Sequence, residues 1–225
     1  MTFNKLSIRT IAVAAALVAV GTSANALTIG TSGLVANSIQ AFSQDALDQF
    51  DLFAITVTPL GNATATATVG AFNLPVTSIS VNSSFKISAG TATGSALKIG
   101  RTLTAGDYSV TVANFEIDFI NHMILADVTV ANPGVPSVTT KKASVYSFNE
   151  ASPLALKYKF PLTITGTQVL DKLFLTESAQ QTMYTGLKLP KVALGVLPTT
   201  DFGTVTQDIK VAFRKAVSTA PYIAP

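Results

Sequence analysis

The 225-residue chain contains no cysteine and no tryptophan, and it has a single histidine. Without cysteine it can form no disulfide, no thiolate metal site and no thiol nucleophile. A Ser-His-Asp triad would have to use His122, which is predicted to lie at an exposed hairpin tip, and no G-x-S-x-G motif supplies a serine nucleophile. Nucleotide-binding glycine motifs are missing as well. These absences predict a protein that is not an enzyme.

Charge is also scarce, since 12% of the residues are charged against about 25% in ordinary soluble proteins. Residues 27–225 carry 13 basic and 12 acidic side chains, so nucleic acid is not expected as a partner. Residues 27–140 are net acidic and residues 141–225 net basic, which would suit complementarity within one fold or between copies. A surface of neutral hydroxyl groups is typical of secreted β-proteins, and also of a chain that packs against itself.

The first 26 residues have the three parts of a secretory signal peptide. Lys5 and Arg9 precede an unbroken apolar run over residues 11–20, and Ala24-Asn25-Ala26 is an A-x-A cleavage site. The run is shorter than the roughly 20 apolar residues of a membrane-spanning helix. We therefore predict that residues 1–26 are cleaved and that residues 27–225 form a single secreted or periplasmic domain with no transmembrane segment. The compact alanine- and valine-rich leader is typical of bacteria.

Alternation of apolar and polar residues dominates the rest of the chain and predicts β-strands. It is clearest over residues 79–87, 154–164 and 209–213, and an Ala/Thr alternation over residues 63–69 predicts a further strand. Pro161 would place the second of these at a sheet edge or a bulge. Residues 43–50 and 176–183 instead begin with Ser43 and Thr176, which are suited to capping short helices. The pattern predicts an all-β fold, a single antiparallel β-sandwich of roughly 8–11 strands with two short helices.

Residues 110–131 predict a hairpin with a definite register. If the turn centres on Asn121-His122, Phe115 faces Val128, Ile117 faces Ala126, and Phe119 faces Ile124. This pairing gives one continuous apolar face, as a correct register should.

The same register gathers three carboxylates on the outer face of the hairpin, with Glu116 opposite Asp127 and Asp118 diagonal to both. Like charges that face each other are destabilising, so a counter-charge is expected. One source is a basic side chain on a neighbouring strand, and the candidates are Lys86, Lys98 and Arg101. The other is a hard cation such as Ca²⁺, bound by Glu116, Asp118 and Asp127, although the glycine-bearing loop of known calcium motifs is missing.

Four lysines form a candidate patch on adjacent strands: Lys141, Lys142, Lys157 and Lys159. Such a patch could bind an anionic polysaccharide or headgroup. Edge lysines also protect a sheet from unwanted strand pairing, which is the commoner role.

Residues 42–61 combine a hydroxyl-capped short helix, a β-strand and the sequence Pro-Leu-Gly. This arrangement resembles segments of the haem-transport associated domain, a family of secreted β-sandwiches. The resemblance implies a sandwich fold and a role in haem binding. The tyrosine or histidine with which that family coordinates haem has no assigned counterpart here among Tyr108, Tyr146, Tyr158, Tyr184 and His122.

The first functional hypothesis is a secreted, non-enzymatic structural, adhesive or extracellular matrix protein without a cofactor. Its partner would be another copy of itself or a surface glycan. The alternative is an extracytoplasmic ligand-binding domain for haem, a glycan or a cation such as Ca²⁺. The predicted export, the neutral hydroxyl surface and the missing catalytic residues favour the first hypothesis.

Overall fold

The computed structural model describes residues 27–30, 35–81, 87–159, 163–210 and 217–225. The predicted signal peptide, residues 1–26, lies outside the described residues, as do Lys86, Pro161 and residues 211–213 of the last predicted strand. No helix in the described part of the chain is long and apolar enough to cross a membrane.

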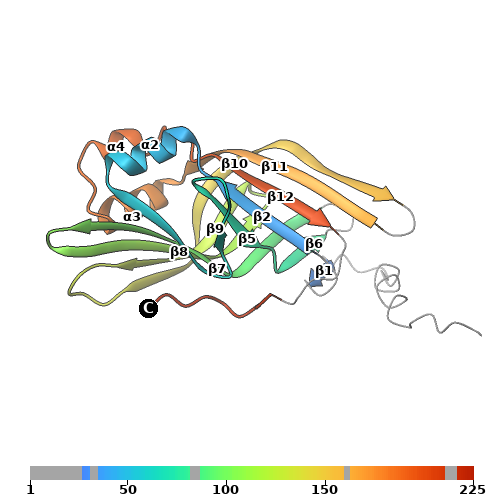
Figure 1. Cartoon of the computed structure of the whole chain (residues 1–225), viewed down its shortest axis with the longest axis horizontal. Helices are drawn as coiled ribbons and strands as arrows, with labels where there is room; N and C mark the ends of the chain where they lie inside the picture. Colours follow the sequence, from blue (N-terminus) through green and yellow to red (C-terminus); the bar gives the residue numbers. More distant parts are fainter. Residues whose placement is uncertain (1–26, 31–34, 82–86, 160–162, 211–216) are drawn as a thin grey trace, which may run out of the picture.

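Twelve antiparallel strands of the described residues form one sheet (Figure 1). Its order is β1-β6-β7-β8-β9-β10-β11-β12-β2-β5-β4, and β3 pairs with β7 beside β6. The bounds are β1 Leu27–Gly30, β2 Val35–Ala41, β3 Ile55–Gly61, β4 Thr64–Ala65, β5 Ala71–Pro75, β6 Ser78–Val81, β7 Ile87–Leu103, β8 Gly106–Asp118, β9 Met123–Ala131, β10 Val138–Lys159, β11 Thr163–Leu175 and β12 Thr204–Lys210.

The sheet curls until it is nearly closed. Thr77, which follows β5 near one end of the strand order, donates its backbone N–H to the carbonyl of Thr91 in β7 at 2.7 Å. The antiparallel all-β prediction is thus confirmed, but the two-layer sandwich is not, because a single hydrogen-bonded path joins the strands. Alternation of apolar and polar residues does not distinguish a two-layer sandwich from a single curled sheet, since both folds bury one face of every strand. The largest fully buried apolar side chains are Val110, Leu170, Leu173, Leu187 and Phe202.

Two predicted strands differ in the structure. Residues 154–159 are the end of β10 and residues 163–164 the start of β11, and the two strands pair through Tyr158 with Ile164 and Lys159 with Thr163. Alternation is preserved when a chain turns back on itself, so the sequence hides this hairpin. Of residues 63–69 only Thr64–Ala65 form a strand, because the Thr66 hydroxyl accepts the Thr68 N–H and closes a local turn.

The predicted register of the β8–β9 hairpin is wrong by two residues. Ile117 pairs with Ile124, and Asp118 pairs with Met123. The turn is longer than predicted because the Asp118 carboxylate accepts the backbone N–H groups of Ile120 at 2.9 Å and Asn121 at 3.0 Å. A shift of two residues keeps the same side chains on the inner face.

A bulge changes the hairpin register again farther from the turn. Asn114 has a positive φ of 54°, and beyond it Ala113 pairs with Asp127. Glu116 pairs with Leu125, so the predicted Glu116–Asp127 pair does not form. Asparagine is among the few residues that readily adopt this backbone conformation.

Both predicted helices are present, as α2 (Gln44–Leu52) and α3 (Glu177–Gly186). The Ser43 hydroxyl accepts the N–H of Ala46 at 3.0 Å, and the Thr176 hydroxyl accepts the N–H of Ala179 at 3.3 Å. A further short helix, α4 (Ala193–Val196), was not predicted. All three helices gather at one end of the molecule (Figure 1).

One side chain of β7 joins the ends of α2 and α3. Arg101 donates through Nε to the carbonyl of Phe53 at 2.9 Å, and through Nη1 to the carbonyls of Leu187, at 3.3 Å, and Lys188. Phe53 and Leu187 are the C-terminal caps of α2 and α3. Because helix C-termini carry partial negative charge and unpaired carbonyls, a guanidinium satisfies both ends at once.

We predict that Arg101→Ala lowers the free energy of unfolding by about 2–3 kcal/mol, the scale of hydrogen bonds made by a charged group. Arg101→Lys should recover little, because an ammonium lacks the fork that reaches separate carbonyls. Urea denaturation followed by circular dichroism measures the loss. Lys98→Ala, at an exposed position of the same strand, is the control, and an equal loss in both variants would contradict the assignment.

Candidate functional site

A cavity lies between α3 and the strands β8, β9 and β10. Its volume is about 390 Å³. Thirteen of its lining residues are apolar and five carry hydroxyl groups, while none is charged. They are Phe50, Ile99, Val110, Val112, Val128, Val130, Val138, Thr140, Ala143, Ser144, Val145, Tyr146, Leu175, Ser178, Ala179, Thr182, Met183 and Phe202.

Local sequence patterns explain how the walls form. Alternate residues of β8 and β9 point inward and form a valine wall, with Val110 and Val112 facing one side of the cavity. On α3, Ala179 and Met183 are spaced by four and share the face that lines the cavity. Gly186 allows α3 to approach the sheet closely, because a Cβ there would lie 2.8 Å from Val110 Cγ2.

Buried aromatic rings lie at the inner end of the cavity. The rings of Tyr146 and Phe202 are 5.8 Å apart, and those of Phe50 and Phe202 are 6.2 Å apart. Burial raises the pKa of Tyr146 to about 12, an effect that the neighbouring Gln40 amide only partly offsets. Gln40 Nε2 makes no hydrogen bond to any described residue. The phenol is therefore neutral at physiological pH.

Exposed and half-buried residues mark the mouth of the cavity. Val138 and Thr140 of β10 are exposed, and Ser178 on α3 is exposed as well. Hydroxyl groups thus lie near solvent while the apolar walls extend inward. The arrangement can enclose an apolar ligand with a polar edge.

The predicted carboxylate cluster is divided among different partners. Asp127 accepts hydrogen bonds from Lys141 Nζ at 2.8 Å, Asn114 Nδ2 at 2.8 Å and the Lys142 backbone N–H at 3.1 Å. Glu116 pairs with Lys142 Nζ at 2.9 Å, a contact that raises the pKa of Lys142. The counter-charges therefore come from β10.

Two of the basic residues proposed from sequence, Arg101 and Lys98, do not supply these charges. Arg101 bonds to the helix ends instead, Lys98 is exposed on β7, and Lys86 lies outside the described residues. The sequence gives no direct signal that Lys141 and Lys142 neutralise these acids, because β10 comes to lie beside the hairpin only through strand pairing in the folded sheet.

Asp118 serves the hairpin turn. Hydrogen bonds from the side chain and backbone of Asn121 hold the pKa of Asp118 below 3.8, its ordinary value. Across the described ranges no group of three or more Asp, Glu, His or Cys side chains is placed to hold a metal ion. The structure therefore does not bring Glu116, Asp118 and Asp127 together.

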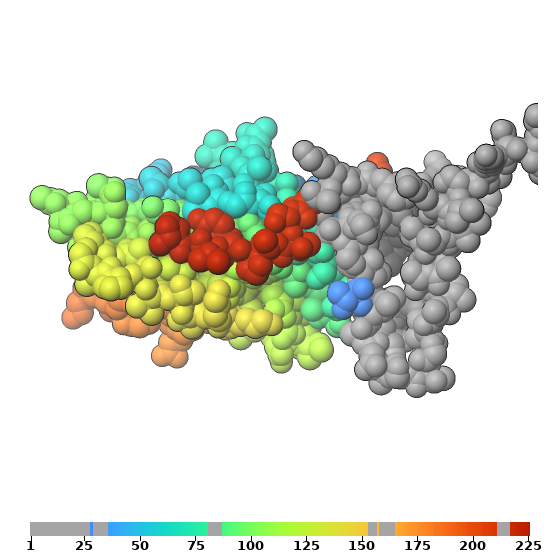
Figure 2. Space-filling view, turned by 90° about the horizontal axis from the view of Figure 1, so that it is seen from below, coloured from blue at the N-terminus to red at the C-terminus, as the bar shows by residue number. Residues whose placement is uncertain are grey.

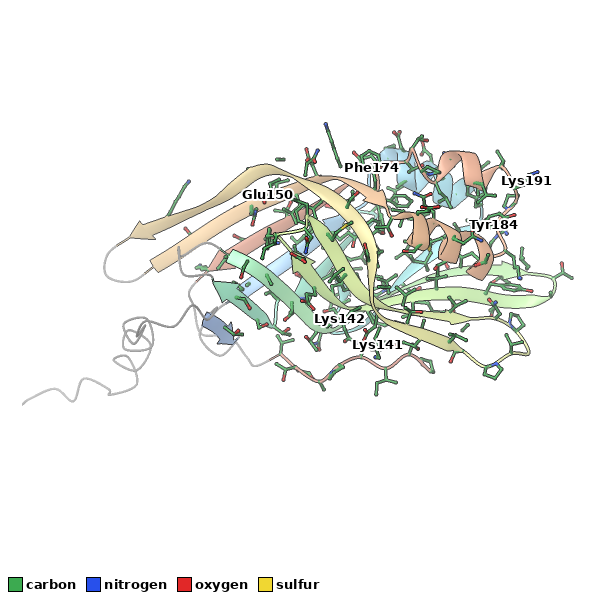
Figure 3. The ribbon with its side chains drawn as sticks, turned by 180° about the vertical axis from the view of Figure 1, so that it is seen from behind. Lys141, Lys142, Glu150, Phe174, Tyr184 and Lys191 are labelled. Atoms are coloured by element: carbon green, nitrogen blue, oxygen red, sulfur yellow. The ribbon has the colours of Figure 1, made fainter. Side chains whose placement is uncertain are left out.

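The predicted lysine patch is likewise dispersed. Figure 3 shows Lys141 and Lys142 next to each other on β10, and both are paired with acids of the hairpin. Lys157 is exposed much farther along the same strand, and the side chain of Lys159 is not among those described. His122, at the hairpin tip as predicted, has Nδ1 3.8 Å from Glu150 Oε1.

Fold and cavity together define a class of all-β domain in which a curled antiparallel sheet carries short helices over an apolar pocket. No protein-family model matches the chain, and no curated protein matches it in sequence. The solved C-terminal domain of HtaA from Corynebacterium glutamicum matches with a TM-score of 0.52 and 17% identity, over 80% of this chain and 99% of that one. A domain-swapped dimer of a variant of that domain matches with a TM-score of 0.47 and 18% identity, over 77% and 97%.

HtaA is a haem-transport associated protein. The resemblance that residues 42–61 indicate is therefore confirmed at the level of the fold. It extends well beyond those residues, since the matched region covers most of this chain.

The Asp127 contacts predict a pH-dependent contribution to stability. Burial pushes the pKa of Asp127 up, but the hydrogen bonds from Lys141, Asn114 and Lys142 outweigh it and leave the pKa below 3.8. A carboxylate with a lowered folded-state pKa stabilises the protein above its unfolded pKa, and the effect is lost as pH falls through the folded value. Asp127→Asn should therefore lower the urea midpoint at pH 7.

The difference between Asp127→Asn and the unsubstituted chain should shrink as pH falls below about 4. Asp208→Asn, at an exposed position of β12, is the matched control and should change the midpoint little at either pH. A difference for Asp127→Asn that stays constant from pH 7 to pH 3 would refute this role of the carboxylate.

Proposed function

We propose that this chain is an extracytoplasmic, non-enzymatic domain that binds a largely apolar ligand in the α3 cavity, with haem as the first ligand to test. The observation that carries the proposal is the cavity of about 390 Å³ between α3 and β8–β10. Its volume lies within the range of roughly 300–1,000 Å³ of known ligand pockets, and its apolar walls and few polar groups are typical of them.

The lining favours one of the three ligand classes considered from sequence. A cation would require carboxylate or carbonyl oxygens, and a glycan would require many hydrogen-bonding groups. No charged residue is among those that line the cavity. An apolar molecule with a polar edge suits these walls best.

Two lining residues belong to the types that ligate haem iron in proteins, Tyr146 and Met183. Tyr146 is a poor donor because its phenol is neutral and lies beside Gln40. Met183, also buried, offers a thioether and would hold the iron. The macrocycle would contact the valine walls, and the haem carboxylates would find hydroxyl groups rather than cations in the lining.

Two further observations support an extracytoplasmic binding domain. The predicted signal peptide indicates export from the cytoplasm. The HtaA domain with a similar fold comes from a haem-transport associated protein. A structural or adhesive role, the first hypothesis from sequence, has no comparable support. A cavity between α3 and the sheet favours ligand binding over that role.

The proposal predicts that both haem and metal-free protoporphyrin bind saturably. Absorbance titration measures the first and fluorescence titration the second. Ala179→Phe places a large side chain of α3 in the cavity and should weaken the affinities for haem and for protoporphyrin by about tenfold or more, since a loss of about 1.4 kcal/mol of binding free energy gives that factor. Ala151→Phe, at an exposed position of β10, is the matched control and should bind as the unsubstituted chain does. Absence of saturable binding, or equal weakening by both substitutions, would overturn the proposal.

Met183→Leu separates iron ligation from apolar contact. Leucine conserves the volume and removes the sulfur. We expect the Soret band of the haem complex to move while protoporphyrin affinity stays unchanged. An unaltered Soret band would remove Met183 as the iron ligand.

A further inference from the structure

Residues 217–225 lie as an extended segment across the outside of the sheet (Figure 2, red). The segment crosses the region where β3, β7 and β8 meet, because its contacts are with Asn62, Gly94 and Asn114. It is outside the α3 cavity, and none of its residues lines that cavity.

Asn114 holds this segment by a two-way amide contact. Its Oδ1 accepts the backbone N–H of Tyr222 at 2.8 Å, and its Nδ2 donates to the carbonyl of Tyr222 at 3.0 Å. The side-chain amide thus pairs with one residue of backbone in the same way as a neighbouring strand does.

Two further contacts, which do not involve the segment, orient the Asn114 amide. Its Oδ1 also accepts the N–H of Gly94 at 3.0 Å, and its Nδ2 donates to Asp127 Oδ2 at 2.8 Å. These bonds determine which way the amide points, so little conformational entropy is lost when the segment binds.

Asn62 makes a second backbone contact four residues upstream in the segment. Its Nδ2 donates to the carbonyl of Ser218 at 2.8 Å and to that of Thr93 at 3.1 Å. Between the two asparagines the segment passes very close to Gly94, where a Cβ would lie 2.8 Å from the carbonyl oxygen of Ala220. Glycine at this position leaves room for the passing backbone.

Most side chains of the segment contribute little to this docking, although Tyr222 is half-buried with its ring close to Gly61. Residues 218–221 are exposed, and Ile223 is 82% exposed. The two asparagines bind backbone atoms of Ser218 and Tyr222, so the site recognises an extended conformation more than a particular sequence.

We propose that Asn62 and Asn114 form a docking site for an extended peptide segment, and that residues 218–222 of a second copy of this chain can occupy it in exchange for the chain's own. The second copy carries the same backbone groups in the same order, so every contact described above can be re-formed between molecules. The chain's own segment has the advantage of a high effective concentration, so exchange is favoured when that segment cannot dock.

Two complementary full-length variants test this directly. Asn114→Gly keeps the positive φ and removes the amide, which leaves a competent segment and a disabled site. Tyr222→Pro removes the backbone N–H that Asn114 accepts, which leaves a competent site and a disabled segment. Each variant alone should be monomeric by sedimentation equilibrium, and their equimolar mixture should form a complex of twice the monomer mass.

The controls keep the outcome interpretable. A double variant with both substitutions, mixed with Asn114→Gly, should remain monomeric because neither chain has a working site. Thermal unfolding checks that each variant is folded, and Asn62→Ala replaces Asn114→Gly if the latter is not. A mixture with the same mass as its separate components, or a double variant that associates equally well, would overturn the proposal.

Discussion

The Arg101 guanidinium is the interaction on which the site depends. It bonds the C-terminal ends of α2 and α3 to the middle of the sheet, through Phe53 on one side and Leu187 on the other. Because α3 forms one wall of the apolar cavity, that wall is held in place by a contact at its far end. Gly186 completes the arrangement, since a larger residue would push α3 away from Val110. One charged contact and one missing side chain therefore help to hold the α3 wall of the cavity in position.

Local signals in the sequence were sufficient for the helix starts. Ser43 and Thr176 cap helices through atoms three residues away, and nothing distant is required. Strand content was likewise predictable from alternation. The sequence suggests Arg101 as a partner of the hairpin carboxylates, because complementary charge is the visible signal. Its actual partners are backbone carbonyls, which every residue carries, so the sequence does not single them out. The cavity could not be predicted, because it arises where a helix crosses strands far away in sequence.

The turn at Asp118 and a bulge in β8 together separate the acids of the hairpin, and the bulge also creates an unexpected surface. The longer turn places Glu116 opposite Leu125 and away from Asp127, and the bulge with a positive φ at Asn114 then places Asp127 opposite Ala113. The same backbone conformation places the Asn114 amide against Asp127 and Tyr222. The acids that were candidates for a cation site are thereby separated, and Asp127 orients the backbone-binding amide of Asn114. The outer face and the inner cavity thus share strands β8 and β9 but differ in chemistry.

The central claim, that a ligand occupies the cavity under α3, is tested most directly by NMR of methionine methyl groups. The chain has three methionines, of which Met183 lines the cavity and Met123 does not. With [ε-¹³C]methionine and a diamagnetic tin protoporphyrin, ring currents should shift the Met183 methyl signal on saturation and leave that of Met123 in place. Saturable binding with an unmoved Met183 signal would contradict the claim.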